Sequence, residues 1–566
     1  MRNQIDFSLS PDDLFLNPAK DPGFFFLSKP EFWWRPHPAS CIEGFAASAD
    51  DATNARIDAL VRQFKRHRSL ETVARVNVVP VLLRNARFAK SYATVEGKCV
   101  LNGAAGARLL NRYGWTLQEK GADPEAVLSG YFARCQSVNE MADLPVAPLP
   151  ETIDFAIECR NTFNYFHFMT ETLCQLCVLD GLRFRGRIFI HFPNHESKTR
   201  AFTQGLIAAL FPEFAGRVIF ERAPKEYPQV LSAYSCAAAF HQMPPSVIGA
   251  FGEVVADGDR PARSVLAMNS FDTSLLSLRN RALAAIEGKD FSHLPRKFYI
   301  TRAPGQSRER RLKGEESLIE LLTAFGFATL AFEDLAPLEQ IALMARAEVM
   351  VSSHGAGFAN MLFANPDATI VEIGTLQTAQ LRWGDFWPIA HAAGCRYITF
   401  FADHDHPNPQ TVPDFQTDGI VPVHLSDRGL GRIMAYVATV CGHIPTFAKA
   451  ADVVRLGGQL LRSGHLTAAQ ALADRHASLD PDNADLCLFR ADLHKAMGEW
   501  GNELLSLHNA WRADSTRWQT LVQILWCARK LEKPDVQTWA VRLLQADFPA
   551  RIADLARGRD WVQQLL

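Results

Sequence analysis

The sequence predicts an α/β fold of two doubly wound, Rossmann-type units followed by an all-helical region. Short apolar runs alternate with amphipathic helical segments between residues 151 and 445, which is the pattern of parallel strands joined by crossover helices. After Pro445 the apolar spacing becomes helical throughout. The chain has 566 residues, more than one hydrophobic core accommodates, so several domains are expected.

Composition narrows the class of protein. Hydrophobic residues make up 48% of the chain and charged residues 21%, as in globular proteins. The 59 basic and 61 acidic residues leave a net charge of −2, which does not favour a nucleic-acid partner. The N-terminal residues contain no apolar signal core, and no apolar run is long enough for a transmembrane segment. We therefore expect a cytoplasmic protein, at most peripheral to the inner membrane.

The first half of the chain divides into two regions. Residues 1–150 are rich in aromatic side chains and are expected to wrap the first α/β unit, with a helix over 54–67 and strands at 76–79, 86–88 and 92–95. Residues 151–290 form that first unit, with strands at 155–157, 187–190 and 218–220 and helices over 168–179 and 202–211.

The second α/β unit covers residues 291–445. Its predicted strands lie at 296–302, 328–332, 349–351 and 369–373, and its helices begin at 315, 338 and 358. Ligands of such units bind at the carboxyl ends of the strands, and both Arg302 and His354 fall at predicted strand ends. A basic loop with Arg308, Arg310 and Arg311 follows Arg302.

The turn after the 349–351 strand is the most informative segment. Gly355 and Gly357 flank Ala356, and glycines can adopt backbone dihedrals closed to other residues and let a ligand approach. The N–H groups of the helix that follows would face an anion. At the end of the next strand, Glu372 would hold ribose hydroxyls, with a salt bridge or a helix cap as the alternative.

These segments together resemble glycosyltransferase family 61, whose members are named for capsular polysaccharide biosynthesis and β-1,2-xylosyl transfer. The resemblance rests on Arg302, Arg310-Arg311-x-x-x-Glu315, Leu335-x-x-x-Glu339-Gln340-Ile341, Ala347-Glu348-Val349, His354-Gly355-Ala356-Gly357-x-x-Asn360, Phe363, Val371-Glu372, the Asn164–Phe168 segment and Trp387–Tyr397. It covers roughly residues 80–400. Gly314 departs from it, because the family has an asparagine there. The resemblance implies a GT-B fold, in which two Rossmann-type domains face a cleft, and a nucleotide-sugar donor.

Three groups of residues are predicted to carry the chemistry. Arg302, with Arg308 or Arg311, and the backbone of Gly355, Ala356 and Gly357 would bind the diphosphate, because arginine forks match phosphate oxygens. His354 would donate to a phosphate oxygen, and Asn360 belongs to the same donor site, although pinning the turn is its alternative role.

The general base is predicted in the first α/β unit. His167 and Glu171 are four residues apart on one helix and share a face, and a carboxylate raises the basicity of a histidine. A capping histidine beneath an aromatic cluster is the alternative. No metal site is predicted, because Asp403-His404-Asp405-His406 is interpreted as a solvated turn, with metal binding as the alternative.

Residues 446–566 are expected to form a tetratricopeptide-like helical tail. Gly464 and Gly498 are 34 residues apart (498 − 464), as are Asp480 and Asp514 (514 − 480). A period of this length with helix–turn–helix units is the tetratricopeptide signature, and a plain helical cap is the alternative. The tail would bind a protein partner.

The resulting hypothesis is a metal-independent, inverting glycosyltransferase without a cofactor. It would transfer a sugar from a nucleotide-sugar, expected to be UDP-linked, to a glycan or glycoconjugate acceptor in bacterial surface polysaccharide assembly. One alternative is a non-catalytic scaffold that binds partners through its tail. The other is a nucleotide-sugar epimerase, which would need no acceptor.

Overall fold

A computed structural model describes residues 5–89, 92–135, 149–159, 164–193, 200–235, 248–254, 260–302, 312–406, 411–415, 417–557 and 559–566. The chain divides into two compact units. Unit 1 consists of Met1–Phe45, Arg56–Glu309 and Leu330–Thr399, and unit 2 of Ala46–Ala55, Arg310–Thr329 and Phe400–Leu566. Unit 1 therefore contains all of the first predicted α/β unit and much of the second.

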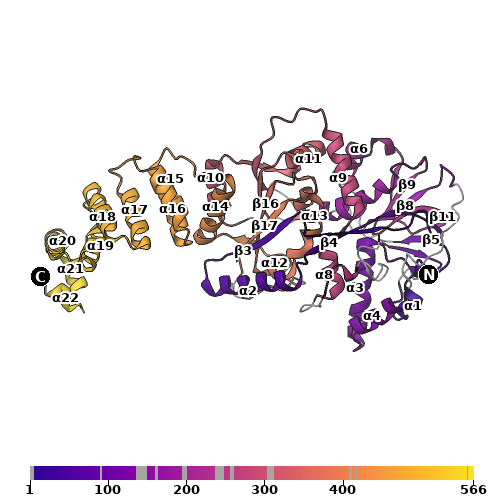
Figure 1. The fold of residues 1–566 in the computed structure, drawn as a ribbon, viewed down its shortest axis with the longest axis horizontal. Helices are drawn as coiled ribbons and strands as arrows, with labels where there is room; N and C mark the ends of the chain where they lie inside the picture. Colours follow the sequence, from indigo (N-terminus) through magenta and orange to yellow (C-terminus); the bar gives the residue numbers. More distant parts are fainter. Residues whose placement is uncertain are drawn as a thin grey trace. The chain divides into compact units, whose positions relative to one another are not determined.

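The first sheet of unit 1 has the strand order β10-β9-β8-β11-β5-β6-β7, with β1 paired to β5. Figure 1 shows β9, β8, β11 and β5 side by side. The strands are β1 (Phe24–Phe26), β5 (Val79–Ala89), β6 (Tyr92–Val95), β7 (Lys98–Cys99), β8 (Phe155–Glu158), β9 (Ile188–His191), β10 (Val218–Glu221) and β11 (Lys225–Tyr234). β8, β9 and β10 are parallel, whereas β11 is antiparallel to β5 along its length. Strands of the aromatic N-terminal region thus extend the sheet of the first α/β unit.

Helices and a small sheet complete this half of unit 1. The small sheet has the order β12-β4-β2, with bounds Ser270–Asp272, Thr72–Val76 and Phe32–Pro36. The helices are α1 (Pro11–Leu14), α3 (Gly103–Glu119), α4 (Pro124–Arg134), α5 (Tyr165–His167), α6 (Ala201–Leu210), η4 (Pro212–Phe214), α8 (Ala262–Met268) and α9 (Thr273–Ile286). The segment predicted as one helix over 168–179 is helical but irregular: a π-helix, η2 (Phe168–Thr172), leads into a 3-10 helix, η3 (Leu173–Leu179).

The second large sheet contains the strands that lead into the glycine turn. Its order includes β14-β13-β15-β16-β17, with bounds Ala328–Ala331, Lys297–Thr301, Val349–Ser353, Thr369–Thr375 and Arg396–His404. β13, β15 and β16 are parallel and in register. Every residue of β16 is buried, as expected for a Thr/Ile/Val-rich strand covered on both faces.

Short helices connect these strands. They are η6 (Phe332–Asp334), α11 (Pro337–Ala345), η7 (Ala356–Phe363), α12 (Leu376–Leu381), η8 (Trp383–Phe386) and α13 (Trp387–Ala393). The predicted helix at 358–363 forms as the 3-10 helix η7. Because β13 and β15 are parallel neighbours, the residues that follow them, Arg302 and His354, lie at the same edge of the sheet.

Unit 2 is mostly helical. It contains α10 (Glu315–Ala324), β18 (Val423–His424), α14 (Asp427–Cys441), α15 (Ala450–Arg462), α16 (Leu466–Arg475), α17 (Ala484–Met497), α18 (Trp500–Ala513), α19 (Trp518–Lys530), α20 (Pro534–Asp547), α21 (Pro549–Ala556) and α22 (Asp560–Gln563). β3 (Cys41–Ala47) and α2 (Asp51–His67) each contribute residues to both units.

The helices of the C-terminal region recur with a period of 34 residues. The first helices of three successive pairs begin at Ala450, Ala484 and Trp518, which are 34 residues apart (484 − 450 and 518 − 484). Figure 1 shows α15 to α20 following one another toward the C-terminus. Gly464 and Gly498 have φ of 81° and 77°, so the predicted period coincides with left-handed turns between paired helices. The assignment to the tetratricopeptide class stays a prediction.

The fold is therefore mixed α/β with a C-terminal helical region, as the sequence predicts. The GT-B arrangement of two facing domains stays a prediction. Among the residues that the structure describes, no helix combines the length and the apolar content needed to cross a bilayer.

Candidate functional site

The predicted strand-end residues Arg302 and His354 contact each other in unit 1. The guanidinium of Arg302 donates from Nη2 to the carbonyl oxygen of His354 at 2.9 Å. The backbone N–H of His354 in turn donates to the carbonyl of Ile373 in β16 at 3.0 Å. The positive charge of Arg302 therefore lies against the start of the glycine turn, at the carboxyl edge of the sheet.

The two glycines of the turn have no unusual dihedrals, which corrects that part of the sequence prediction, and each has little room for a Cβ. Gly355 has φ 176° and ψ 174°, an extended conformation that other residues adopt, and Gly357 lies within η7. A Cβ on Gly355 would stand 2.6 Å from Nη2 of Arg302, and one on Gly357 would stand 3.1 Å from the ring of Phe332. The turn is therefore packed directly against an arginine and an aromatic ring.

Glu372 binds side chains of the chain itself. One carboxylate oxygen is hydrogen-bonded to Nδ1 of His354, and the other accepts from the hydroxyl of Tyr397 and, at 3.2 Å, from Thr399. Glu372 is the fourth of the seven residues of β16 and is 2% exposed. The sequence placed it at the strand end, open to ribose hydroxyls; the structure places it inside the strand, with both oxygens occupied.

The contact with Glu372 determines which nitrogen of His354 can react. An ionised carboxylate only accepts hydrogen bonds, so Nδ1 carries the proton and Nε2 presents its lone pair. Burial and the neighbouring Glu372 raise the pKa of Tyr397, which keeps that hydroxyl protonated as a donor. Such a histidine–carboxylate dyad can accept a proton or, once protonated, donate one to a phosphate oxygen.

His167 and Glu171 form a second dyad of the same kind. Nδ1 of His167 lies 2.6 Å from Oε1 of Glu171, and both side chains are partly buried. The backbone N–H of His167 is capped by Oδ1 of Asn164 at 3.1 Å. The residues after His167 form the π-helix η2, and π-turns within helices recur at functional sites.

Two aromatic rings in contact, Phe386 and Phe166, connect the two dyads. The ring of Phe386 lies 5.3 Å from that of His354 and 5.4 Å from that of Phe166, measured between centroids. Phe166 also makes an edge contact with His167 at 5.3 Å. Both histidines therefore adjoin a single aromatic cluster. Sequence reasoning gave no role to Phe386 or Tyr397, although the family resemblance extended over Tyr397.

Asn360 is enclosed by protein groups. It is 1% exposed, accepts from the hydroxyl of Tyr165 at 2.7 Å and donates to Oε1 of Gln340 at 3.1 Å. Both ends of its amide are thus bound within the chain, which favours the alternative role of pinning the turn over a contact with the donor. Arg308 and Arg311, also assigned to the donor site, lie outside the described residues.

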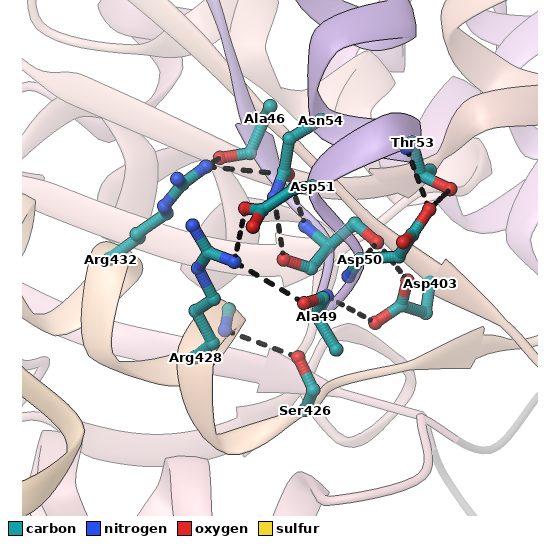
Figure 2. Close-up of polar contacts among 12 residues, drawn as sticks. Ala46, Ala49, Asp50, Asp51, Thr53, Asn54, Asp403, Ser426, Arg428 and Arg432 are labelled. Atoms are coloured by element: carbon teal, nitrogen blue, oxygen red, sulfur yellow. Dashed lines mark hydrogen bonds and ion pairs between the residues drawn. The ribbon is translucent and has the colours of Figure 1, made fainter. Parts of the chain in front are cut away.

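Asp403 and His404 are the last residues of β17, and His404 is buried, so this part of the segment is not the solvated turn that the sequence predicts. The carboxylate of Asp403 accepts from the hydroxyl of Ser48 and, at 3.0 Å, from the N–H of Ala49 (Figure 2). Nearby, Arg428 is paired with Asp51 at 2.5 Å. Within the described ranges, no group of three or more His, Cys, Asp or Glu side chains is arranged to hold a metal ion. Asp403 therefore ties the segment before α2 to the end of β17.

Comparison with known proteins finds one family that this region resembles. Residues 165–371 match the family model described as Glycosyltransferase 61. No curated protein matched the chain. The matched segment begins at Tyr165, includes His167, Glu171 and His354, and ends one residue before Glu372. Over residues 165–371, the segment that contains most of both dyads, the chain is therefore similar to glycosyltransferase family 61.

Proposed function

We propose that this protein transfers a sugar from a UDP-linked donor to the hydroxyl of a glycan or glycoconjugate acceptor. The observation that carries the proposal is the pair of histidine–carboxylate dyads, His167–Glu171 and His354–Glu372, beside one aromatic cluster. Of the four dyad residues, all but Glu372 lie within the segment that matches Glycosyltransferase 61. Assembly of a bacterial surface polysaccharide is the proposed setting.

The His354 side of the site is proposed to stabilise the departing diphosphate. Arg302 supplies a fixed positive charge next to the turn, because its guanidinium is bound to the carbonyl of His354. The first N–H groups of η7 precede the intrahelical hydrogen bonds and suit an anion. Charge that develops on the leaving group is best stabilised by groups already held in place.

The His167 side is proposed to activate the acceptor. The acceptor oxygen forms a bond to the anomeric carbon while its proton passes to Nε2 of His167, which Glu171 orients through Nδ1. The bond between the anomeric carbon and the diphosphate oxygen breaks, and its electron pair leaves with the nucleoside diphosphate. A single displacement of this kind inverts the configuration at the anomeric carbon.

We propose that no divalent cation takes part in the reaction. The support is the presence of cationic and N–H groups at the turn, which can meet the charge of the diphosphate. Transfer measured with EDTA and with added Mg²⁺ or Mn²⁺ tests this part. Equal rates support it, and a rate that vanishes in EDTA and returns with metal contradicts it.

The test of the proposal combines binding with turnover. Thermal shifts are measured with UDP and with UDP-glucose, UDP-N-acetylglucosamine and UDP-xylose, and release of UDP is then followed with and without a mixture of oligosaccharide acceptors. Wild type should be stabilised by a UDP ligand and should release UDP faster with an acceptor. The His354→Gln variant should lose both effects.

Two outcomes favour other functions. Isomerisation of the donor sugar without release of UDP points to an epimerase. No thermal shift with any nucleotide favours a scaffold.

For the helical region, we propose a protein partner, supported by its repeated helix pairs, which form extended binding surfaces in other repeat proteins.

A further inference from the structure

The hydroxyl of Tyr165 connects α5 to the segment that follows the glycine turn. It donates to Oδ1 of Asn360 in η7 at 2.7 Å and lies 3.2 Å from Oε1 of Gln340 in α11. The amide of Asn360 completes the triangle by donating to Gln340 at 3.1 Å. Three polar groups from three separate elements of unit 1 thus bind one another.

The orientation of each group in this triangle is fixed by its partners. Nε2 of Gln340 donates to the carbonyls of Phe332 and Leu335 at 2.8 and 3.0 Å, so its Oε1 faces Asn360 and Tyr165. The Nδ2 of Asn360 then points to Gln340, which leaves Oδ1 as the acceptor for Tyr165. Networks in which every member is satisfied hold a single arrangement.

Tyr165 is close in sequence and structure to the His167–Glu171 dyad. It is the first residue of α5, and His167 is the last. The ring between them, Phe166, contacts Phe386, which contacts His354. The Tyr165 hydroxyl therefore makes a polar contact between the His167 segment and η7, which begins directly after Gly355.

We propose that Tyr165, acting through Asn360 and Gln340, is a positioning residue that sets His167 in register with His354. The proposal rests on the proposed function, since the two histidines serve opposite ends of one displacement there. The proposal also gives a role to Gln340, a residue on which the family resemblance rests but to which the sequence analysis gave no function. Turnover is sensitive to such alignment, because a displacement of about 1 Å can cost about 100-fold in rate.

The test compares Tyr165→Phe with Tyr113→Phe. Each removes one ring hydroxyl, from a partly buried Tyr165 and from a buried Tyr113. The hydroxyl of Tyr113 donates to the carbonyl of Leu9 at 3.1 Å, away from the site. UDP release from the best donor of the panel is measured to separate kcat from KM. We expect kcat of Tyr165→Phe to fall at least about tenfold, with KM for the donor within about twofold of wild type. Tyr113→Phe should retain wild-type kcat.

A second readout does not require turnover. Chemical shifts of the His167 ring are recorded on protein with selectively ¹³C-labelled histidine, assigned with His167→Gln. Tyr165→Phe should shift the His167 resonance, whereas Tyr113→Phe should not. If wild type releases no UDP from any donor, the proposed function fails, and the resonance still reports whether Tyr165 positions His167.

Two outcomes overturn the inference. One is a Tyr165→Phe variant with unchanged kcat and an unchanged His167 resonance. The other is an equal loss of kcat in Tyr113→Phe, which would assign the effect to general loosening of unit 1. If Tyr165→Phe does not fold, Gln340→Met removes the oxygen that accepts from Asn360 and Tyr165, which breaks the triangle at another corner and carries the same expectations.

Discussion

Nδ1 of His167 lies 2.6 Å from Oε1 of Glu171 across a turn of π-helix. The carboxylate orients the imidazole and stabilises the imidazolium that would form when His167 takes a proton. Glu171→Gln preserves the shape of the side chain but removes that negative charge. We expect it to lower kcat by about 10²-fold to 10⁴-fold with little change in donor binding. Steady-state UDP release checks this, with the exposed Glu226→Gln as control; equal loss in both variants would contradict it.

Tyr397→Phe tests the support of the other dyad. The substitution removes the hydroxyl that donates to Glu372 and leaves Thr399 as the remaining donor to that oxygen. We expect the free energy of unfolding of unit 1 to fall by about 2 kcal/mol, the cost of an underbonded buried group. Urea unfolding followed by tryptophan fluorescence measures the change. A stability equal to that of wild type would mean that the contact contributes nothing.

Gly355→Ala tests the contact between the turn and Arg302. The extended backbone at Gly355 admits alanine, but the new Cβ would stand 2.6 Å from Nη2 of Arg302 and displace it. We expect the protein to remain folded, while its affinity for UDP falls about tenfold because the proposed contact of Arg302 with a phosphate would be lost.

The control for this variant is the Arg302→Ala background. Without the guanidinium there is no clash, so adding Gly355→Ala should cause no further loss of UDP affinity in isothermal titration. Additive losses in the double variant would instead mean that the glycine serves the ligand directly.

Glu158, at the end of β8, makes stability depend on pH. Burial raises the pKa of its carboxyl to about 7, although the hydrogen bond from Asn102 acts to lower that pKa. The native state therefore keeps a proton that the unfolded chain releases above its ordinary pKa of 4.5. The contribution of Glu158 to the free energy of unfolding is full below pH 4.5 and falls as pH rises to about 7, by up to about 3 kcal/mol. In Glu158→Gln the free energy of unfolding should fall less between pH 4.5 and pH 7 than it does in wild type.

His191, beside it on β9, has the opposite effect. Burial lowers the pKa of its imidazole to about 3, so the native state stays neutral where the unfolded chain takes up a proton. This contribution is complete above pH 6.5 and is lost as pH falls toward 3. Urea unfolding of His191→Phe should lack this acid loss, whereas Glu158→Gln should retain it. If His191→Phe loses as much stability as wild type when pH falls from 6.5 toward 3, the acid loss does not come from His191.

The helical region contains a matched pair of sites for testing backbone strain. Gly498 follows α17 with φ 77°, and Glu532, 34 residues later (532 − 498), has φ 54° at the equivalent place. Left-handed backbone costs residues with a Cβ about 1 kcal/mol. We expect Gly498→Ala to destabilise α17–α18, and Glu532→Gly to stabilise α19–α20, each by up to about 1 kcal/mol. Hydrogen exchange of those helices checks both; changes of equal sign would contradict the argument.

The sequence predicts the elements with strong local signals. The apolar runs at 349–351 and 369–373 become β15 and β16, and the spacing of His167 and Glu171 places them in contact. The partners of Glu372 depend on long-range pairing, because β17 must lie beside β16 before Tyr397 can reach the carboxylate. The lack of space at Gly355 is likewise due to a tertiary contact, with Arg302, which lies 53 residues earlier (355 − 302). Local dihedral preferences cannot reveal such a contact.

The constant spacing of the helix pairs makes the length of the C-terminal region adjustable in whole steps. Removing residues 484–517 would place Trp518 directly after Asn483, whose side chain already caps the start of a helix. Each pair in such a stack packs mainly on its neighbours, so the remaining junctions would keep their contacts. The region could thus be shortened by one period, with a single new junction, between the α15–α16 pair and α19, in place of the contacts that α17 and α18 make.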